Sequence, residues 1–435
     1  MDQLPNARKI ELRDLKSALR SKYSDSEDIE VVKFTSESLL PLGENYGSTI
    51  LKVHAIIKRK GEDEEENLDL VAKMMPPTDF QRIAFDVDTS FEKEAFLYEQ
   101  LIPSYQKLER EMGIPEDQVF DIVAELYGVR RSLLPDSKID DDAVILMENL
   151  IAAGYYNVDR KIGFDLEHGK MAAEALSRFH ALGIATKQHK PELFETFKTR
   201  AKCIKFAIDF NAAEGLNEMY LQILSDDSEI APHIEEIRSA VGVDYIEQLN
   251  ATPPEPWSTI IHNDFWTNNI MFRKDESTGQ VSDIKFVDFQ NYLFLSPLRE
   301  LVFFLVLNLD ENTMEENFRE LIDLYYNNFV SVLKKMKCDV EAFNRDAFDE
   351  RLKVDAFSVF LHCMYMIMPT TCDQSDVPEV MKGFQEILEA GADPDNVTEK
   401  MKNVTMPPLS PLYFKKIRRI VKKYVEYGWF HCNDC

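Results

Sequence analysis

Hydrophobic and polar residues alternate near the N-terminus and follow a helical spacing farther along the chain. Residues 48–60 are rich in β-branched side chains, residues 61–67 (GEDEEEN) are polar, and residues 68–75 (LDLVAKMM) are apolar again. A strand, a polar turn and a second strand form an antiparallel hairpin. Further strands are expected within residues 119–129 and 142–148, so the first part of the chain predicts a small sheet.

Helical spacing first appears at residues 90–106, where Ser90 is the expected N-cap, and dominates past residue 160. The later helices are expected at residues 166–182, within 191–224, and at 313–337, 345–368, 375–390 and 410–427. Only residues 258–288 interrupt them with strand-like segments. The pattern predicts an α+β fold with a small β-rich N-terminal lobe (residues 1–150) and a larger, mainly helical C-terminal lobe (residues 151–435).

Charge narrows the range of partners. Lys and Arg total 50 against 77 Asp and Glu, a net charge of −27, which repels nucleic-acid phosphates and anionic lipid surfaces. We therefore expect no nucleic acid and no membrane as partner, and a neutral or cationic small molecule as substrate. The N-terminus lacks the apolar core of a signal peptide, and the apolar stretch 301–309 is far shorter than the roughly 20 residues that span a bilayer. A cytoplasmic protein is expected, and the pattern leaves its oligomeric state open.

The most informative segment is residues 260–289. His262 and Asp264 are followed by Asn269, five positions after the aspartate, and then by Asp288. A strand, a polar turn and a strand between Asn269 and Asp288 fold the second aspartate back toward the asparagine. Each residue alone would be an ordinary turn residue, but together they match the H-x-D-x-x-x-x-N catalytic loop and the following metal-binding aspartate of kinases.

Phosphoryl transfer needs a carboxylate beside the attacking hydroxyl and oxygen ligands for Mg²⁺ on the nucleotide phosphates. We assign Asp264 to the hydroxyl, and Asn269 and Asp288 to Mg²⁺. His262 is a second catalytic candidate, although bracing of the loop suits it better than proton transfer. The cofactors expected are ATP and Mg²⁺.

The N-terminal lobe should supply a phosphate-binding lysine and its glutamate partner. Lys73 lies in a V-A-K sequence close to the V-A-I-K pattern, and a lysine among apolar residues needs a partner. Glu94 on the next helix is the expected partner, with Glu92 and Glu99 as rivals.

Two further segments are candidates for nucleotide binding. Gly43, Asn45 and Ser48 lie between two predicted strands, where a phosphate-covering loop belongs, although a plain hairpin turn would look the same. Glu148 and Asn149 follow an apolar strand, where the backbone of a lobe hinge would contact adenine.

Assembled, these motifs resemble the ecdysteroid kinase-like (CHK kinase-like) family, related to choline kinases and aminoglycoside phosphotransferases. The residues that carry the resemblance are 43–46 with Ser48, 71–73, Phe91, Glu94, 96–99, 147–150, 179–182, 262–272, 285–290 and 296–297. Asn263 stands where related loops often have Gly, and Glu300 where relatives usually have Asp, which braces the catalytic loop.

The resemblance implies a bilobal protein-kinase-like fold and ATP-dependent phosphorylation of a hydroxyl on a small, often steroidal, molecule or xenobiotic. A protein kinase would also need an activation segment closed by an A-P-E-like motif, and only ten residues separate Asp288 from the next apolar helix. The remaining alternative is a catalytically weak or inactive kinase-like ligand-binding protein, and Glu300 is the feature that points to it.

Overall fold

The computed structural model describes residues 8–19, 22–23, 29–39, 47–134, 137–205, 214–242, 245–373 and 410–431. The chain forms two compact units: the first comprises Met1–Gln100, Val123–Tyr156 and Ile204–Ala207, and the second comprises Leu101–Ile122, Asn157–Cys203 and Ile208–Cys435. The expected α+β class, with a small β-rich part and a larger helical part, is confirmed. A single boundary at residue 150 differs from these units, because the helix after Leu101 packs on a helix of the second unit.

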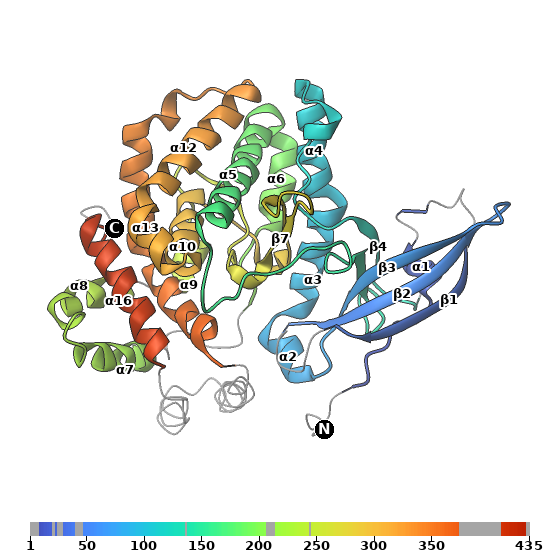
Figure 1. The fold of residues 1–435 in the computed structure, drawn as a ribbon, viewed down its shortest axis with the longest axis horizontal. Coiled ribbons are helices and arrows are strands. Elements are labelled where there is room, and N and C mark those ends of the chain that lie inside the picture. The colour runs from blue at the N-terminus through green and yellow to red at the C-terminus, as the bar shows by residue number, and fades with distance from the viewer. Residues whose placement is uncertain are drawn as a thin grey trace. The chain divides into compact units, whose positions relative to one another are not determined.

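The first unit is built on a five-stranded antiparallel sheet in the order β1-β2-β3-β5-β4 (Figure 1). Its strands are β1 (Ile29–Ser38), β2 (Thr49–Arg59), β3 (Glu65–Met74), β4 (Leu126–Arg130) and β5 (Val144–Glu148). Its helices are α1 (Leu15–Ala18), α2 (Asp79–Ala84) and α3 (Val87–Phe96), and α3 runs into a π-helical turn (Leu97–Leu101).

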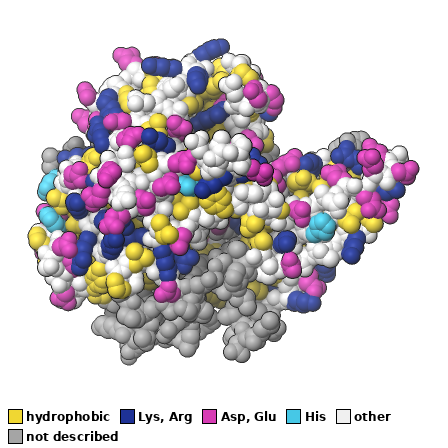
Figure 2. All heavy atoms as spheres, viewed as in Figure 1, with side chains coloured by type: hydrophobic (Ala, Val, Ile, Leu, Met, Phe, Trp, Pro, Cys, Tyr) yellow, Lys and Arg dark blue, Asp and Glu magenta, His cyan; other side chains and the backbone are white. Residues whose placement is uncertain are grey.

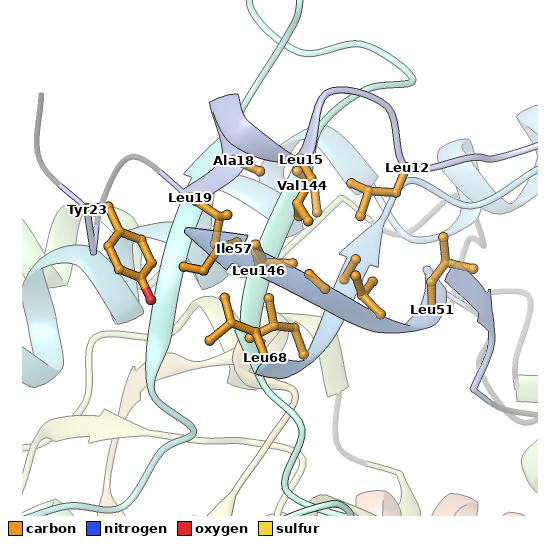
Figure 3. Close-up of a cluster of buried hydrophobic side chains, with 14 of the residues drawn as sticks. Leu12, Leu15, Ala18, Leu19, Tyr23, Leu51, Ile57, Leu68, Val144 and Leu146 are labelled. Carbon is orange, nitrogen blue, oxygen red and sulfur yellow. The ribbon is translucent and has the colours of Figure 1, made fainter. Parts of the chain in front are cut away.

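The alternation along β2 and β3 explains how this sheet forms a core. Val53, Ala55 and Ile57 on β2 are fully buried, as is Leu70 on β3. They pack with Leu15 of α1 and its neighbours on one face of the sheet (Figure 3). Because successive side chains of a strand point to opposite faces, the intervening positions of β3 point to the other face.

The second unit is mainly helical, with α5 packed against α12 and α10 against α13. Its helices are α4 (Ile102–Met112), α5 (Leu166–His189), α6 (Pro191–Arg200), α7 (Glu214–Ser225), α8 (Ile234–Val241), α9 (Tyr245–Asn250), α10 (Pro297–Asn308), α11 (Glu311–Glu316), α12 (Phe318–Lys335), α13 (Arg345–Thr371) and α16 (Pro411–Glu426). Every residue of α10 is buried, including the polar Arg299, Glu300 and Asn308.

Two short two-stranded sheets lie among these helices. β6 (Thr259–Ile261) pairs with β9 (Leu293–Leu295), and β7 (Ile270–Lys274) pairs with β8 (Val281–Phe286), both antiparallel. The β7–β8 hairpin is the one predicted between Asn269 and Asp288.

Several local predictions need correction. The acidic turn after β2 is shorter than expected, because β3 already begins at Glu65. Ser90 does not cap a helix: α3 begins at Val87, and the Ser90 hydroxyl lies inside it and donates to the Val87 carbonyl at 3.2 Å. The strand expected within residues 119–129 is confined to β4. The helix predicted at residues 375–390 lies outside the described residues.

One helix among the described residues, α13, is long and apolar enough to cross a membrane by length and composition. Of its most apolar window, 56% is buried inside the protein, which is also typical of a core helix. The absence of a membrane partner therefore stays a prediction.

Candidate active site

The predicted catalytic motif lies on the loop that follows β6, residues 262–269, in the second unit. Asn263 has a φ of 64°, in the left-handed region, where asparagine is tolerated better than most non-glycine residues. The loop closes in a 3₁₀ turn, Thr267–Asn269, whose last residue leads directly into β7. The substitution of the usual Gly by Asn263 therefore leaves the turn of this loop intact.

Asp264 and Asn269 are in direct contact. The Asn269 Nδ2 atom donates to Asp264 Oδ2 at 2.9 Å and to the Asp264 carbonyl oxygen at 2.9 Å. Since the amide nitrogen makes both bonds, the amide oxygen of Asn269 remains as the atom that a cation would use. The Asp264 side chain is held in place while staying half-exposed.

The β7–β8 hairpin brings Asp288 back to Asn269. Ile270 pairs with Phe286, and the Val287 amide donates to the Asn269 carbonyl oxygen at 3.0 Å. Asp288 comes next, with a φ of 64°. The two predicted Mg²⁺ ligands therefore lie side by side.

The donor set of this pair fits Mg²⁺. Magnesium prefers oxygen ligands and is usually bound through one or two protein carboxylates, with substrate phosphates and water completing the octahedron. Asp288 offers a carboxylate and Asn269 an amide oxygen. Within the described residues no group of three or more His, Cys, Asp and Glu is arranged to hold a metal, so bound phosphates would have to provide further ligands.

His262 is placed as a bracing residue. Its ring is fully buried, Nε2 lies 2.9 Å from the Val287 carbonyl oxygen, and the ring centroid lies 4.4 Å from that of Phe289. The carbonyl requires Nε2 to carry the proton, and burial lowers the pKa of the ring. His262 thus positions the segment that carries Asp288, which is the bracing role that the sequence favoured for it. A part for His262 in catalysis stays a prediction.

A buried carboxylate braces the 262–269 loop from α10. Glu300 Oε2 accepts the His262 amide at 2.9 Å, and Oε1 accepts the Asn263 amide at 2.5 Å. Oε2 also accepts from His180 Nε2 on α5 at 2.8 Å. The longer side chain of Glu300 therefore still makes the contact expected of the usual Asp.

The residue that lies behind this brace was not predicted from the sequence. His180 Nδ1 lies 2.8 Å from the hydroxyl of Tyr325 on α12, and both side chains are fully buried. With Nε2–H donated to Glu300, Nδ1 accepts from the tyrosine hydroxyl. His180 lies in the F-H-A-L segment that carried the family resemblance, but nothing in the sequence pointed to its contact with an α12 residue.

In the first unit, Lys73 pairs with Glu94. Leu70 and Ala72 on β3 face the sheet core, so Lys73 points to the opposite face, where its Nζ lies 2.5 Å from Glu94 Oε2 on α3. Both side chains are buried, at 9% exposure for Lys73 and 2% for Glu94. Removing either partner would therefore leave the other charge buried and unpaired.

The rival glutamates have another partner. Arg131 donates to Glu92 Oε1 at 2.7 Å and to Glu99 Oε2 at 3.0 Å. These carboxylates lie on the side of α3 and its π-helical turn that faces Arg131. The choice of Glu94 as the partner of Lys73 is therefore settled by the structure, while the role of the pair in nucleotide binding stays a prediction.

The other nucleotide-binding candidates are placed only in part. The Asn149 amide donates to the Asp69 carbonyl at 3.1 Å, and its Oδ1 accepts the amides of Ile151 and Ala152, so its side chain shapes the turn after β5. Glu148 is the last residue of β5. Ser48, which precedes β2, is buried. Gly43 and Asn45 lie outside the described residues.

Comparison with known proteins identifies the family. The sequence profile of the ecdysteroid kinase-like family matches residues 42–338, well over half of the chain. No curated protein matches. A choline/ethanolamine kinase family protein from Mesorhizobium loti is similar at 12% identity over 89% of this chain and 92% of that one, with a TM-score of 0.30. The chain belongs to the ecdysteroid kinase-like family and is a small-molecule kinase-like protein.

Proposed function

We propose that the protein is an ATP- and Mg²⁺-dependent phosphotransferase that acts on a hydroxyl group of a small molecule, a steroid or xenobiotic alcohol. The observation that carries the proposal is the direct contact between Asp264 and Asn269, beside Asp288, in the second unit. A phosphotransferase needs these groups, and elsewhere in a protein a half-exposed carboxylate held this way has little structural use.

Each side chain has one task in this reaction. Asp264 orients the acceptor hydroxyl and takes its proton as the bond to phosphorus forms. Asn269 and Asp288 would hold Mg²⁺, which neutralises charge on the phosphates when it is bound. Lys73 would bind phosphate oxygens, and Glu94 keeps its ammonium group in position.

The alternative of a catalytically weak or inactive kinase-like ligand-binding protein rested on Glu300. Its carboxylate accepts both loop amides and His180, and this intact brace supports the proposal of an active enzyme. The choice of acceptor follows from the family alone, and the cytoplasmic location from the sequence.

The decisive variant is Asp264→Asn, which keeps the shape of the side chain but removes the basic oxygen. We expect kcat to fall by about 10²–10⁴-fold with little change in ATP affinity, because other groups hold the nucleotide. The assay is ADP release with steroids, choline-like amines and other alcohols, with mass detection of the product and calorimetry for nucleotide binding.

Asp283→Asn is the matched control. Its carboxylate lies on β8 and pairs with Arg273 at 2.8 Å on the surface, so kcat should not change. Undiminished turnover by Asp264→Asn would refute its assignment as the catalytic carboxylate. Nucleotide binding by the unaltered protein without phosphorylation of any alcohol would instead support the inactive alternative.

A further inference from the structure

Three cationic side chains of the second unit, Arg160, Lys416 and Arg419, are close enough for their charges to interact; we call them the 160/416/419 cluster. Lys416 and Arg419 are separated by less than one turn on α16. Lys416 Nζ donates to the Arg160 carbonyl oxygen at 2.8 Å, which ties α16 to the segment before α5. In Figure 2, Lys and Arg side chains gather among acidic ones over the region where α16 lies in Figure 1.

The burial of Lys416 in this cluster is electrostatically unfavourable. Its side chain is buried at 3% exposure. Burial, together with the charges of Arg419 and Arg160, lowers the pKa of Lys416 to about 8, and Asp159 opposes this only partly. A buried ammonium without a carboxylate partner is unfavourable, and two neighbouring guanidinium groups increase the cost.

Each of the two arginines has an N–H group without a hydrogen-bond acceptor among the described residues. The Nε atoms of Arg160 and Arg419 are buried and have no hydrogen-bond partner in the described part of the chain. Arg160 Nη2 donates to the Cys372 carbonyl at 3.0 Å, at the end of α13. None of the three cations forms an ion pair with a described carboxylate. A guanidinium presents five N–H donors, so most of this capacity is unused.

Two of the carboxylates that act on the charge of Arg419 pair with other cations. Burial lowers the pKa of Arg419, and Glu311, Glu315 and Asp310 oppose this. Glu311 pairs with Lys415 at 2.6 Å, and Glu315 pairs with Lys422 at 2.8 Å. In a chain of net charge −27, ample acid was available to neutralise the cluster, yet it remains cation-rich.

We propose that the 160/416/419 cluster binds a small oxyanion, the phosphate or sulfate group of a small molecule. Guanidinium edges match such anions with paired N–H donors, and Lys416 adds a compact charge. If the cations served only to fasten α16, the bonds of Lys416 and Arg160 to carbonyl groups would be accounted for. Both buried Nε atoms would remain without acceptors.

The test is calorimetry of the full chain with inorganic phosphate and with glycerol 2-phosphate, both in the presence of a saturating non-hydrolysable Mg-ATP analogue to occupy the nucleotide site. Arg419→Gln is the main variant, because the structure gives Arg419 no hydrogen bond whose loss would disturb the fold. We expect one saturable site in the unaltered protein and an affinity about 10–100-fold weaker in the variant.

Arg418→Gln is the matched control, since Arg418 is adjacent but pairs with Asp227 at 2.6 Å; its phosphate affinity should equal that of the unaltered protein. Tighter binding of glycerol 2-phosphate would assign the site to a phosphorylated small molecule, and tighter binding of inorganic phosphate to the free anion. Absence of saturable binding, an unchanged affinity in Arg419→Gln, or equal loss in both variants would overturn the proposal.

Discussion

The carboxylate of Glu300 accepts three N–H groups inside the second unit, and Glu300→Gln tests what this brace contributes. One carboxylate oxygen serves the Asn263 amide, and the other serves the His262 amide and His180. In glutamine one of these oxygens becomes an NH₂ group. Whichever way the amide is turned, at least one of the three donors then faces another donor.

The magnitude follows from those contacts. A buried donor left unsatisfied costs about 1–3 kcal/mol. The bonds that remain change from charge-assisted to neutral, which loses about 1 kcal/mol each. We therefore expect Glu300→Gln to lower the free energy of unfolding by about 3–5 kcal/mol. This is a large share of a typical stability of about 5–15 kcal/mol.

The variant should also impair catalysis, because the brace fixes the backbone immediately before Asp264. A displacement of about 1 Å in such a loop costs on the order of 100-fold in rate. The assays are urea unfolding followed by circular dichroism, and kcat with the acceptor identified as above. Glu320→Gln is the control: its carboxylate pairs with Lys170 at 2.6 Å on the surface, and its loss should cost less than about 1 kcal/mol. If Glu300→Gln unfolds within about 0.5 kcal/mol of the unaltered protein and keeps its kcat, the brace has no energetic role.

Three further predictions test the remaining contacts. Asp288→Asn should weaken Mg-ATP binding in calorimetry and nearly abolish turnover while the circular dichroism spectrum is kept; unchanged turnover at limiting Mg²⁺ would contradict its role. Lys73→Met should reduce phosphoryl transfer strongly and Glu94→Gln less, and greater damage in Glu92→Gln would show that the wrong glutamate was assigned. Gly183→Ala should lower the midpoint of thermal unfolding and cost about 1–3 kcal/mol of stability, because a Cβ there would lie 2.1 Å from Thr259 Oγ1 at the start of β6. An unchanged midpoint would show that β6 shifts to accommodate the methyl group without a loss of stability.

Sequence patterns predicted the parts of the fold that depend on short-range order. The hairpins β2–β3 and β7–β8 follow from apolar strands that flank a polar turn. Apolar residues at helical spacing located α5, α12 and α13. The start of α3 was missed because Ser90 is a good cap in isolation, yet its hydroxyl lies inside the helix. The preference of single residues for capping positions is a weak predictor of where a helix begins, because tertiary packing also determines its ends.

The site was predictable where spacing alone brings residues together. Asp264 and Asn269 are five positions apart on one loop, and a hairpin returns Asp288 to them. The choice between Glu94 and its rivals was not predictable from the sequence, because it depends on Arg131. Arg131 follows β4 and binds the other two carboxylates. The contact of His180 with Tyr325 spans 145 positions, a separation at which no periodicity is informative.

Around the 262–269 loop, the side chains that hold the backbone in place are different from the side chain proposed to contact the acceptor hydroxyl. Glu300 from α10 and His180 from α5 fix the loop through backbone amides, and His262 fixes the Val287 carbonyl. Because these bonds use main-chain groups and fully buried side chains, the half-exposed carboxylate of Asp264 is needed for none of them. Its contact with Asn269 instead orients the carboxylate on the braced loop, as the proposed catalytic role requires. This division explains why the best test of function, a change at Asp264, is also the one least expected to disturb the fold.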